Sequence, residues 1–260
     1  MKAGQEIVNK SGFPFQLLLE KLIISSPETR NWRIIAKEHR WVNAETGEEK
    51  YIDLLLEREG LPIRFIVECK RISGNWYFLM PVNPFNTTPN TKLLSVDYRD
   101  YQYSWKEKNL FPESQEAKYC VMETEGKRDN RMLEKIAGET LLSLEYFARE
   151  DTEVMKSIIE RLGLSNSIMF YLPIIVTTAK LNDITFNRSE INIETGNISD
   201  SDSKPIKFIR FRKNLSTGIE YKFANSSITS IDQLNSEYDR TVFVVQAKSF
   251  IEFLSMINSY

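Results

Sequence analysis

Two short runs of the chain place acidic and basic side chains within apolar sequence. The first, Tyr51–Glu57, carries Asp53, and the second, Ile63–Arg71, carries Glu68 and Lys70. A strand turns successive side chains to opposite faces, so Glu68 and Lys70 would point the same way. A hairpin of the two runs would also bring Asp53 beside Glu68. Charged groups are costly in apolar surroundings unless they are paired or bind a metal. The pattern therefore predicts two carboxylates and an ammonium at one place.

Hydrolysis of a phosphodiester bond needs a positioned water molecule and relief of charge on the phosphate. Mg²⁺ or Mn²⁺ provides both, and Mg²⁺ prefers oxygen ligands together with retained waters. Asp53 and Glu68 are therefore the candidate metal ligands, and the backbone carbonyl of Cys69 is the candidate third ligand. Lys70 would orient or deprotonate the attacking water, or stabilise the developing negative charge. The alternative is that Lys70 only forms an ion pair with Glu68 or Asp53 at a sheet edge.

The Glu-x-Lys spacing is not specific by itself. It recurs in polar or turn-like sequence, and once in a strand with a solvated face: Glu48-Glu49-Lys50, Glu116-Ala117-Lys118, Glu125-Gly126-Lys127 and Glu220-Tyr221-Lys222. The triplet that ends in Lys70 differs because an apolar run leads directly into it and a strand with Asp53 precedes it. This context, rather than the triplet alone, indicates a catalytic set.

The arrangement resembles the PD-(D/E)xK nucleases, whose fold is that of the restriction endonucleases. The similarity covers about residues 11–71, which read as a helix, a strand, the Asp strand and the Glu-x-Lys strand. It implies an α/β fold with a mixed central sheet flanked by helices and a restriction-endonuclease-like core. It also implies that Asp53 and Glu68 bind the divalent metal and that Lys70 takes part in water activation.

The chain departs from the family pattern at two places. Ile52 stands where the motif's proline would precede the aspartate. Many members also bind the metal with a glutamate of the first helix, and the nearest positions here are Gln16 and, one turn later, Glu20. Gln16 has the family-like spacing but no charge, so the resemblance leaves either residue as the candidate for a further ligand.

Composition indicates an ordinary globular protein. The chain has 260 residues, of which 42% are hydrophobic and 27% are charged, enough for a sizeable core. Cys69 and Cys120 lie in apolar runs, which favours reduced, buried thiols. No apolar run approaches the roughly 20 residues of a membrane helix, and the first ten residues lack the apolar core of a secretory signal. We expect a cytoplasmic protein without a membrane partner.

The chain is expected to form a single nuclease-like domain, residues 1–260, with an aromatic-rich insertion at about 73–118. Prolines and asparagines predict a long loop there. Its aromatic side chains would stack on bases or fill a subcore, and we favour the subcore. The other predicted elements are a helix from Ser11, strands over 32–42, 118–124, 168–178, 206–212 and 241–247, helices over 131–149, 152–162 and 250–257, and a polar loop over 197–205.

The formal charge of −2 means that contacts with nucleic acid must come from local basic side chains. Arg71 is the first candidate because Ser73-Gly74 predicts that the strand ends there, although Arg71 could equally pair with an acidic neighbour. Lys207, Arg210 and Arg212 form a basic cluster on a strand expected to be half-exposed. That cluster would track phosphates or simply form a solvated strand face.

The expected function is that of an Mg²⁺-dependent endonuclease acting on DNA. One alternative is a catalytically silent module that binds nucleic acid or a protein on the same fold. Another is an effector subunit of a multi-component prokaryotic defence system, which only the resemblance suggests. Many relatives dimerise to cut both strands, so the resemblance also implies a homodimer as a candidate assembly.

Overall fold

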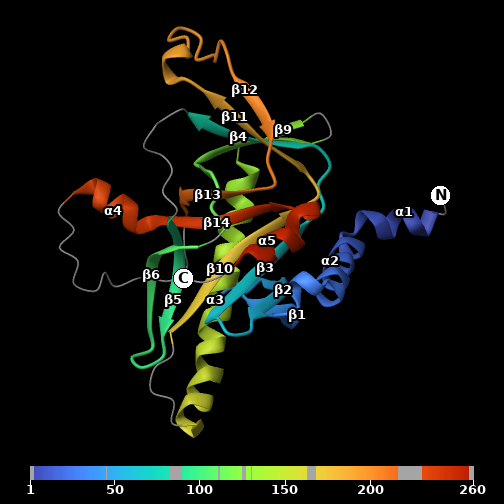
Figure 1. Cartoon of the computed structure of the whole chain (residues 1–260), viewed down its shortest axis with the longest axis vertical. Helices are drawn as coiled ribbons and strands as arrows, with labels where there is room; N and C mark the ends of the chain where they lie inside the picture. The colour runs from blue at the N-terminus through green and yellow to red at the C-terminus, as the bar shows by residue number, and fades with distance from the viewer. Residues whose placement is uncertain are drawn as a thin grey trace.

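The computed structural model describes residues 3–44, 46–81, 90–110, 112–124, 127–129, 131–162, 168–215 and 230–257. In this part of the chain, a large mixed sheet is flanked by helices, and a smaller sheet lies at one end of the molecule (Figure 1). The α/β class with a mixed central sheet flanked by helices is therefore confirmed.

The candidate residues lie in the first half of the large sheet. Three successive antiparallel strands, β1, β2 and β3, are followed by β10, which runs parallel to β3. A parallel neighbour requires a crossover, and the long helix α3 precedes β10 on this return path. These elements are α2 (Phe13–Ser25), β1 (Trp32–Val42), β2 (Glu49–Arg58), β3 (Ile63–Lys70), α3 (Met132–Leu162) and β10 (Ile168–Thr177).

The second half of the large sheet continues from β10. β14 pairs with β10 in parallel, β13 pairs with β14 in antiparallel fashion, and β7 lies beyond β13. The β5–β6 hairpin pairs with the first part of β10. These strands are β5 (Asn90–Asp97), β6 (Gln102–Asn109), β7 (Glu116–Ala117), β13 (Phe208–Asn214) and β14 (Asp239–Gln246).

The smaller sheet has the strand order β12-β11-β4-β8-β9 and forms the upper part of Figure 1. Three short helices complete the described fold, and α1 points away from the body of the molecule (Figure 1). These elements are β4 (Asn75–Pro81), β8 (Tyr119–Thr124), β9 (Lys127–Asp129), β11 (Lys180–Phe186), β12 (Asp202–Pro205), α1 (Ala3–Lys10), α4 (Ile231–Tyr238) and α5 (Phe250–Met256).

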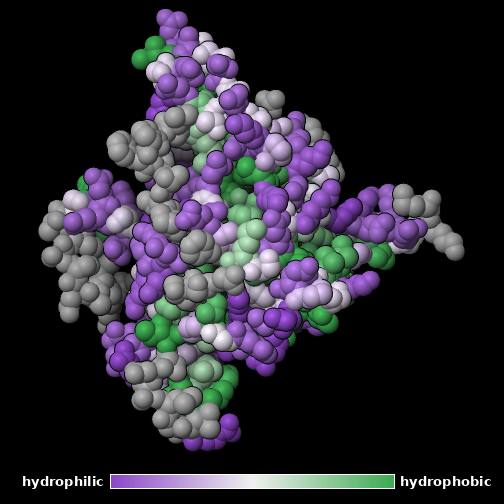
Figure 2. Space-filling model, viewed as in Figure 1, coloured by the Kyte–Doolittle hydropathy of each residue, from purple (hydrophilic) through white to green (hydrophobic). Residues whose placement is uncertain are grey.

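Packing explains why β3 is so apolar. It lies between β2 and β10, so both of its edges are paired, and helices cover both of its faces. Phe65 and Val67 belong to the core cluster that includes residues of α2 and α5, whereas Ile66 packs on the other face with residues of α3. Figure 2 shows hydrophilic residues over much of this face, with hydrophobic residues gathered at its centre and beside α2.

Several predicted elements differ in the structure. α3 is one helix of 31 residues where the sequence predicts two. Asp151 and Thr152, at the expected break, are buried, and the Thr152 hydroxyl donates to the Ala148 carbonyl one turn earlier. The prediction of a long loop over 73–118 is wrong, because the described residues of this segment form β4, β5, β6 and β7. The loop predicted over 197–205 likewise contains β12.

The aromatic side chains of this insertion behave mainly as core residues. Trp76 and Phe78 of β4 are fully buried and pack with residues of α3, β13 and β14. Within the described residues, no helix combines the length and the apolar character needed to span a membrane.

Candidate active site

The regular pairing of β2 with β3 stops next to Asp53. The pair at this end of the ladder is Leu54 with Val67. Asp53, the residue that precedes Leu54 in β2, contacts β3 through its side chain instead, and its Oδ2 accepts a hydrogen bond from the Cys69 N–H at 2.5 Å. The aspartate is thus held against β3 where the regular pairing of the two strands stops.

Glu68 and Lys70 project from the same face of β3, the face that also carries Ile66. Their side chains form an ion pair of 2.5 Å between Nζ and Oε1, with exposed fractions of 31% for Lys70 and 19% for Glu68. Thr177 of β10 pairs with Lys70, so β3 is still paired with β10 beside the ion pair but no longer with β2. The structure therefore brings Asp53, Glu68 and Lys70 together at one end of neighbouring antiparallel strands.

The three charges perturb one another. Burial and the neighbouring Glu68 carboxylate raise the pKa of Asp53 to about 7, although the Cys69 N–H and the Lys70 ammonium act in the opposite direction. Burial lowers the pKa of Lys70, but the carboxylates of Glu68, Asp53 and Glu139 together outweigh burial and the net pKa is raised. Lys70 is consequently an ammonium at neutral pH, which suits a charge stabiliser better than a base.

Gln16 and Glu20 of α2 have different roles. Gln16 is buried, and its Nε2 donates a hydrogen bond of 3.1 Å to the Asp53 backbone carbonyl. Glu20 is also buried, but its Oε2 lies 2.9 Å from Nζ of Lys37 on β1. Gln16 therefore supports the backbone that carries the aspartate, whereas Glu20 is committed to an ion pair with β1.

Glu38 is a neighbour of the site that sequence reasoning missed. The β1–β2 register pairs Lys37 with Leu54 and His39 with Ile52, which places Glu38 across from Asp53. Glu38 has a φ of 49°, in the left-handed region that is uncommon for residues other than glycine. Its charge contributes to the raised pKa of Asp53. No sequence signal marks this position, because it lies in a polar run typical of an exposed strand.

The donor atoms fit a hard cation. Among the residues that the structure describes, no three His, Cys, Asp or Glu side chains are grouped so that they could hold a metal ion. Among the same residues, Oε2 of Glu68 has no hydrogen-bond or ion-pair partner, whereas the Asp53 carboxylate also interacts with the Cys69 thiol. A strand residue directs its N–H and C=O to the same side, so the Cys69 carbonyl points toward Asp53. Two carboxylates and a carbonyl suit Mg²⁺, which keeps several waters.

The thiol of Cys69 is a poor ligand in this setting. Burial raises its pKa well above the ordinary value, and the carboxylates of Asp53 and Glu68 add to that effect. The group remains a protonated thiol at neutral pH, so only the backbone oxygen of Cys69 is a candidate ligand.

Arg71 and Lys207 are exposed. Arg71 follows the last residue of β3, next to the candidate site. Lys207 lies just before β13, and its Nζ forms an ion pair of 2.7 Å with Glu252 of α5. Of these two residues, only Arg71 lies next to the candidate site along the chain. It has no acidic partner among the described residues.

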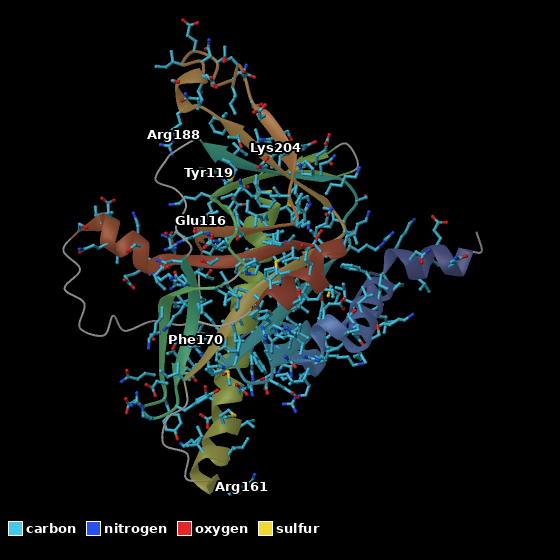
Figure 3. The ribbon with its side chains drawn as sticks, viewed as in Figure 1. Glu116, Tyr119, Arg161, Phe170, Arg188 and Lys204 are labelled. Atoms are coloured by element: carbon cyan, nitrogen blue, oxygen red, sulfur yellow. The ribbon has the colours of Figure 1, made fainter. Side chains whose placement is uncertain are left out.

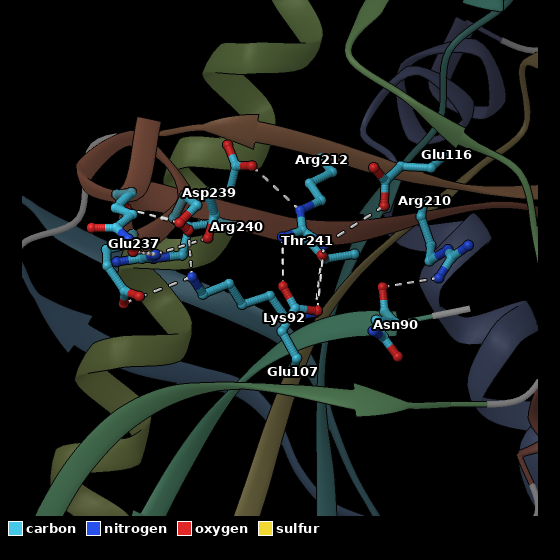
Figure 4. A network of polar contacts seen from close by, with 12 residues as sticks. Asn90, Lys92, Glu107, Glu116, Arg210, Arg212, Glu237, Asp239, Arg240 and Thr241 are labelled. Atoms are coloured by element: carbon cyan, nitrogen blue, oxygen red, sulfur yellow. Dashed lines mark hydrogen bonds and ion pairs between the residues drawn. The ribbon is translucent and has the colours of Figure 1, made fainter. Parts of the chain in front are cut away.

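Arg210 and Arg212 do not form an exposed basic face, which corrects the half-exposed strand expected there. Arg210 is buried and donates to the backbone carbonyls of Asn90 and Ser114. Arg212 has a side chain 12% exposed and pairs with Glu107 at 2.5 Å (Figure 4). The guanidinium groups join β13 to the segments around β5, β6 and β7, so they are not presented to a surface ligand.

Comparisons with protein-family models, with curated proteins and with solved structures returned no match to this chain. The functional argument therefore depends on the residues and on their geometry.

Proposed function

We propose that the protein is a metal-dependent phosphodiesterase that cleaves DNA. The observation that carries the proposal is the position of Asp53, a largely buried carboxylate whose pKa is raised to about 7 beside Glu68. Perturbed carboxylates of this kind are common where a site is prepared for a cation. A bound divalent ion would relieve the repulsion and favour the ionised form of Asp53.

The chain supplies distinct roles at this site. Asp53, Glu68 and the Cys69 carbonyl would hold Mg²⁺ or Mn²⁺, and Gln16 fixes the Asp53 backbone. The metal, when bound, lowers the pKa of water and relieves the charge of the phosphate. Lys70 keeps a positive charge near the reacting phosphate and orients the attacking water. Because Lys70 is paired with Glu68, the ammonium has a fixed starting position.

The order of elements supports the same reading. A helix, three antiparallel strands, a crossover helix and a strand parallel to the third are consistent with the restriction-endonuclease-like core that the sequence resembles. The proposal also includes a cytoplasmic location and, from the resemblance alone, a homodimer or a larger prokaryotic defence complex as the working assembly.

A second candidate is a non-catalytic module that binds nucleic acid or a protein. The ion pair between Glu68 and Lys70 favours it, because the two groups satisfy each other without a metal. In that case, Asp53 would be the only one of the three charged groups whose burial is unfavourable.

A cleavage assay separates the two candidates. Purified protein is incubated with supercoiled plasmid, single-stranded DNA and RNA, with Mg²⁺, with Mn²⁺ or with chelator. We expect metal-dependent nicking of DNA that falls by about 10²-fold or more in Asp53→Ala and in Lys70→Ala. Lys118→Ala is the control, because Lys118 ends another Glu-x-Lys triplet and is exposed. Metal-independent DNA binding without cleavage of any substrate would favour the binding module.

A further inference from the structure

The first helix of the chain, α1, has little to pack against in a single copy. It contains 8 residues, and residues 4–10 are all exposed. Figure 3 shows its side chains standing clear of the other elements. Helices shorter than about 12–15 residues are marginal in water, and most helices in proteins are stabilised by packing of an apolar face. A stable α1 therefore requires a surface that a single copy does not provide.

The next helix, α2, is apolar on its outer side as well as on its buried side. Its buried side carries the apolar residues that pack in the core. A surface helix normally has polar residues on the opposite side. Instead, Phe13, Leu17 and Ile24 recur there at helical spacing, with exposed fractions of 59%, 60% and 77%. An outer face of this kind is typical of a helix that is covered on both sides.

The exposed apolar side chains of these two helices form what we call the α1–α2 surface. Its members are Ile7, Val8, Phe13, Leu17, Leu18 and Ile24. Together they expose on the order of 700 Å², close to the roughly 800 Å² that each partner contributes to a standard protein interface. The surface is therefore large enough to support an association between two copies of the chain.

The charges of the two helices are complementary. Lys21 is exposed in the outer face of α2, between Leu17 and Ile24, and no acidic side chain pairs with it among the described residues. On α1, Glu6 precedes the apolar Ile7, and it pairs only with Lys10 of the same helix, at 3.1 Å. An α1 helix laid on the outer face of α2 can thus match apolar residues with apolar residues and Glu6 with Lys21.

The joint between the helices directs α1 away from its own α2. Gly12 has a φ of 84°, a left-handed conformation that glycine adopts without strain. From this turn, α1 extends away from the body of the molecule (Figure 1). Its natural acceptor is consequently the α2 of another copy.

We propose that two copies of this chain associate through the α1–α2 surface, with α1 of each copy on the outer face of α2 of the other. The exchange is reciprocal, so one two-fold axis relates the copies and closes the assembly. Each Lys21 then meets the partner's Glu6. The proposal concerns the outer side of α2, whereas Gln16 supports Asp53 from its buried side. It gives the homodimer a specific interface and does not rest on the phosphodiesterase activity.

Sedimentation equilibrium without metal or DNA tests the proposal. We expect the wild type to dimerise with a Kd of about 10 μM or tighter. Ile24→Glu and Ile7→Glu should each weaken the dimer about tenfold or more, because each places a carboxylate in an apolar interface. Ile231→Glu is the matched control, since Ile231 of α4 is 75% exposed and Ile24 is 77% exposed, and it should leave the Kd unchanged. All three positions are exposed in one copy, so the variants should keep the circular dichroism of the wild type.

Hydrogen exchange measured along a dilution series reports on α1 itself. The amides of residues 5–10 should exchange about tenfold or more slowly in the dimer than in the diluted monomer. The proposal is overturned if the wild type is monomeric up to about 100 μM, including the case in which it binds neutral lipid vesicles instead. It is also overturned if either Ile7→Glu or Ile24→Glu dimerises as tightly as Ile231→Glu, or if the exchange of α1 does not depend on concentration.

Discussion

Replacing Asp53 by asparagine should make the protein more stable at alkaline pH. The asparagine side chain keeps an oxygen that can accept the hydrogen bond from the Cys69 N–H, and it has nearly the same shape. It removes the charge that burial and Glu68 disfavour. Residues that a protein keeps for function often lower its stability. We therefore expect Asp53→Asn to gain stability and to lose activity.

The magnitude follows from the two pKa values of Asp53. The pKa is about 7 in the folded protein and 3.8 as the ordinary value, so the folded state binds a proton that the unfolded state releases between these limits. Stability therefore falls as the pH rises from about 4 to about 7, and the full penalty is present above that range. A shift of about 3 units corresponds to about 4 kcal/mol. Partial exposure of the carboxylate reduces this to about 2 kcal/mol.

Urea denaturation of the wild type and Asp53→Asn at two pH values measures the effect. We expect the variant to be more stable by about 2 kcal/mol near pH 8, and by about 1 kcal/mol or less near pH 4.5. Asp97→Asn is the control with the opposite sign, because hydrogen bonds from Arg99 lower the pKa of Asp97 to about 2. A variant of Asp53 that is less stable near pH 8, or a difference that does not change with pH, would refute the reasoning.

Four further outcomes follow from the same geometry. Mg²⁺ or Mn²⁺ should raise the Tm of the wild type but not of Asp53→Asn, as differential scanning fluorimetry can measure. Arg71→Ala should weaken DNA binding and flatten its salt slope by about one counterion, and an unchanged slope would make Arg71 structural. Gln16→Ala should cost about 1 kcal/mol of unfolding free energy, because the Asp53 carbonyl loses its donor. Arg210→Met should lower stability in urea by about 1–3 kcal/mol without changing DNA affinity, since it leaves the carbonyls of Asn90 and Ser114 unsatisfied.

The candidate site could be predicted from sequence because its residues are close along the chain. Asp53, Glu68 and Lys70 lie on two strands joined by a short turn, and the apolar residues between them fix the pairing of the strands. Local alternation is then enough to say which side chains meet. The helix that supports the site and the antiparallel order of β1, β2 and β3 follow from the same short-range pattern.

The remaining errors arise where distant segments decide the environment. The alternation of apolar and basic residues in β13 is typical of a half-exposed strand, but carbonyls from Asn90 and Ser114 make Arg210 an interior residue. Glu38 faces Asp53 only because of the irregularity in β1, which no residue type announces. The helix α3 does not break at Asp151, because Arg64 of β3 forms an ion pair with that carboxylate. Such partners lie far apart in the sequence, so local patterns cannot reveal them.

The most direct test of the proposed metal site is a crystal soaked in Mn²⁺, examined by anomalous scattering. The account predicts one Mn²⁺ bound by the carboxylates of Asp53 and Glu68 and by the Cys69 carbonyl, and no such peak in Asp53→Asn crystals treated identically. A wild-type crystal with no anomalous peak between Asp53 and Glu68, and with Lys70 still paired to Glu68, would contradict it.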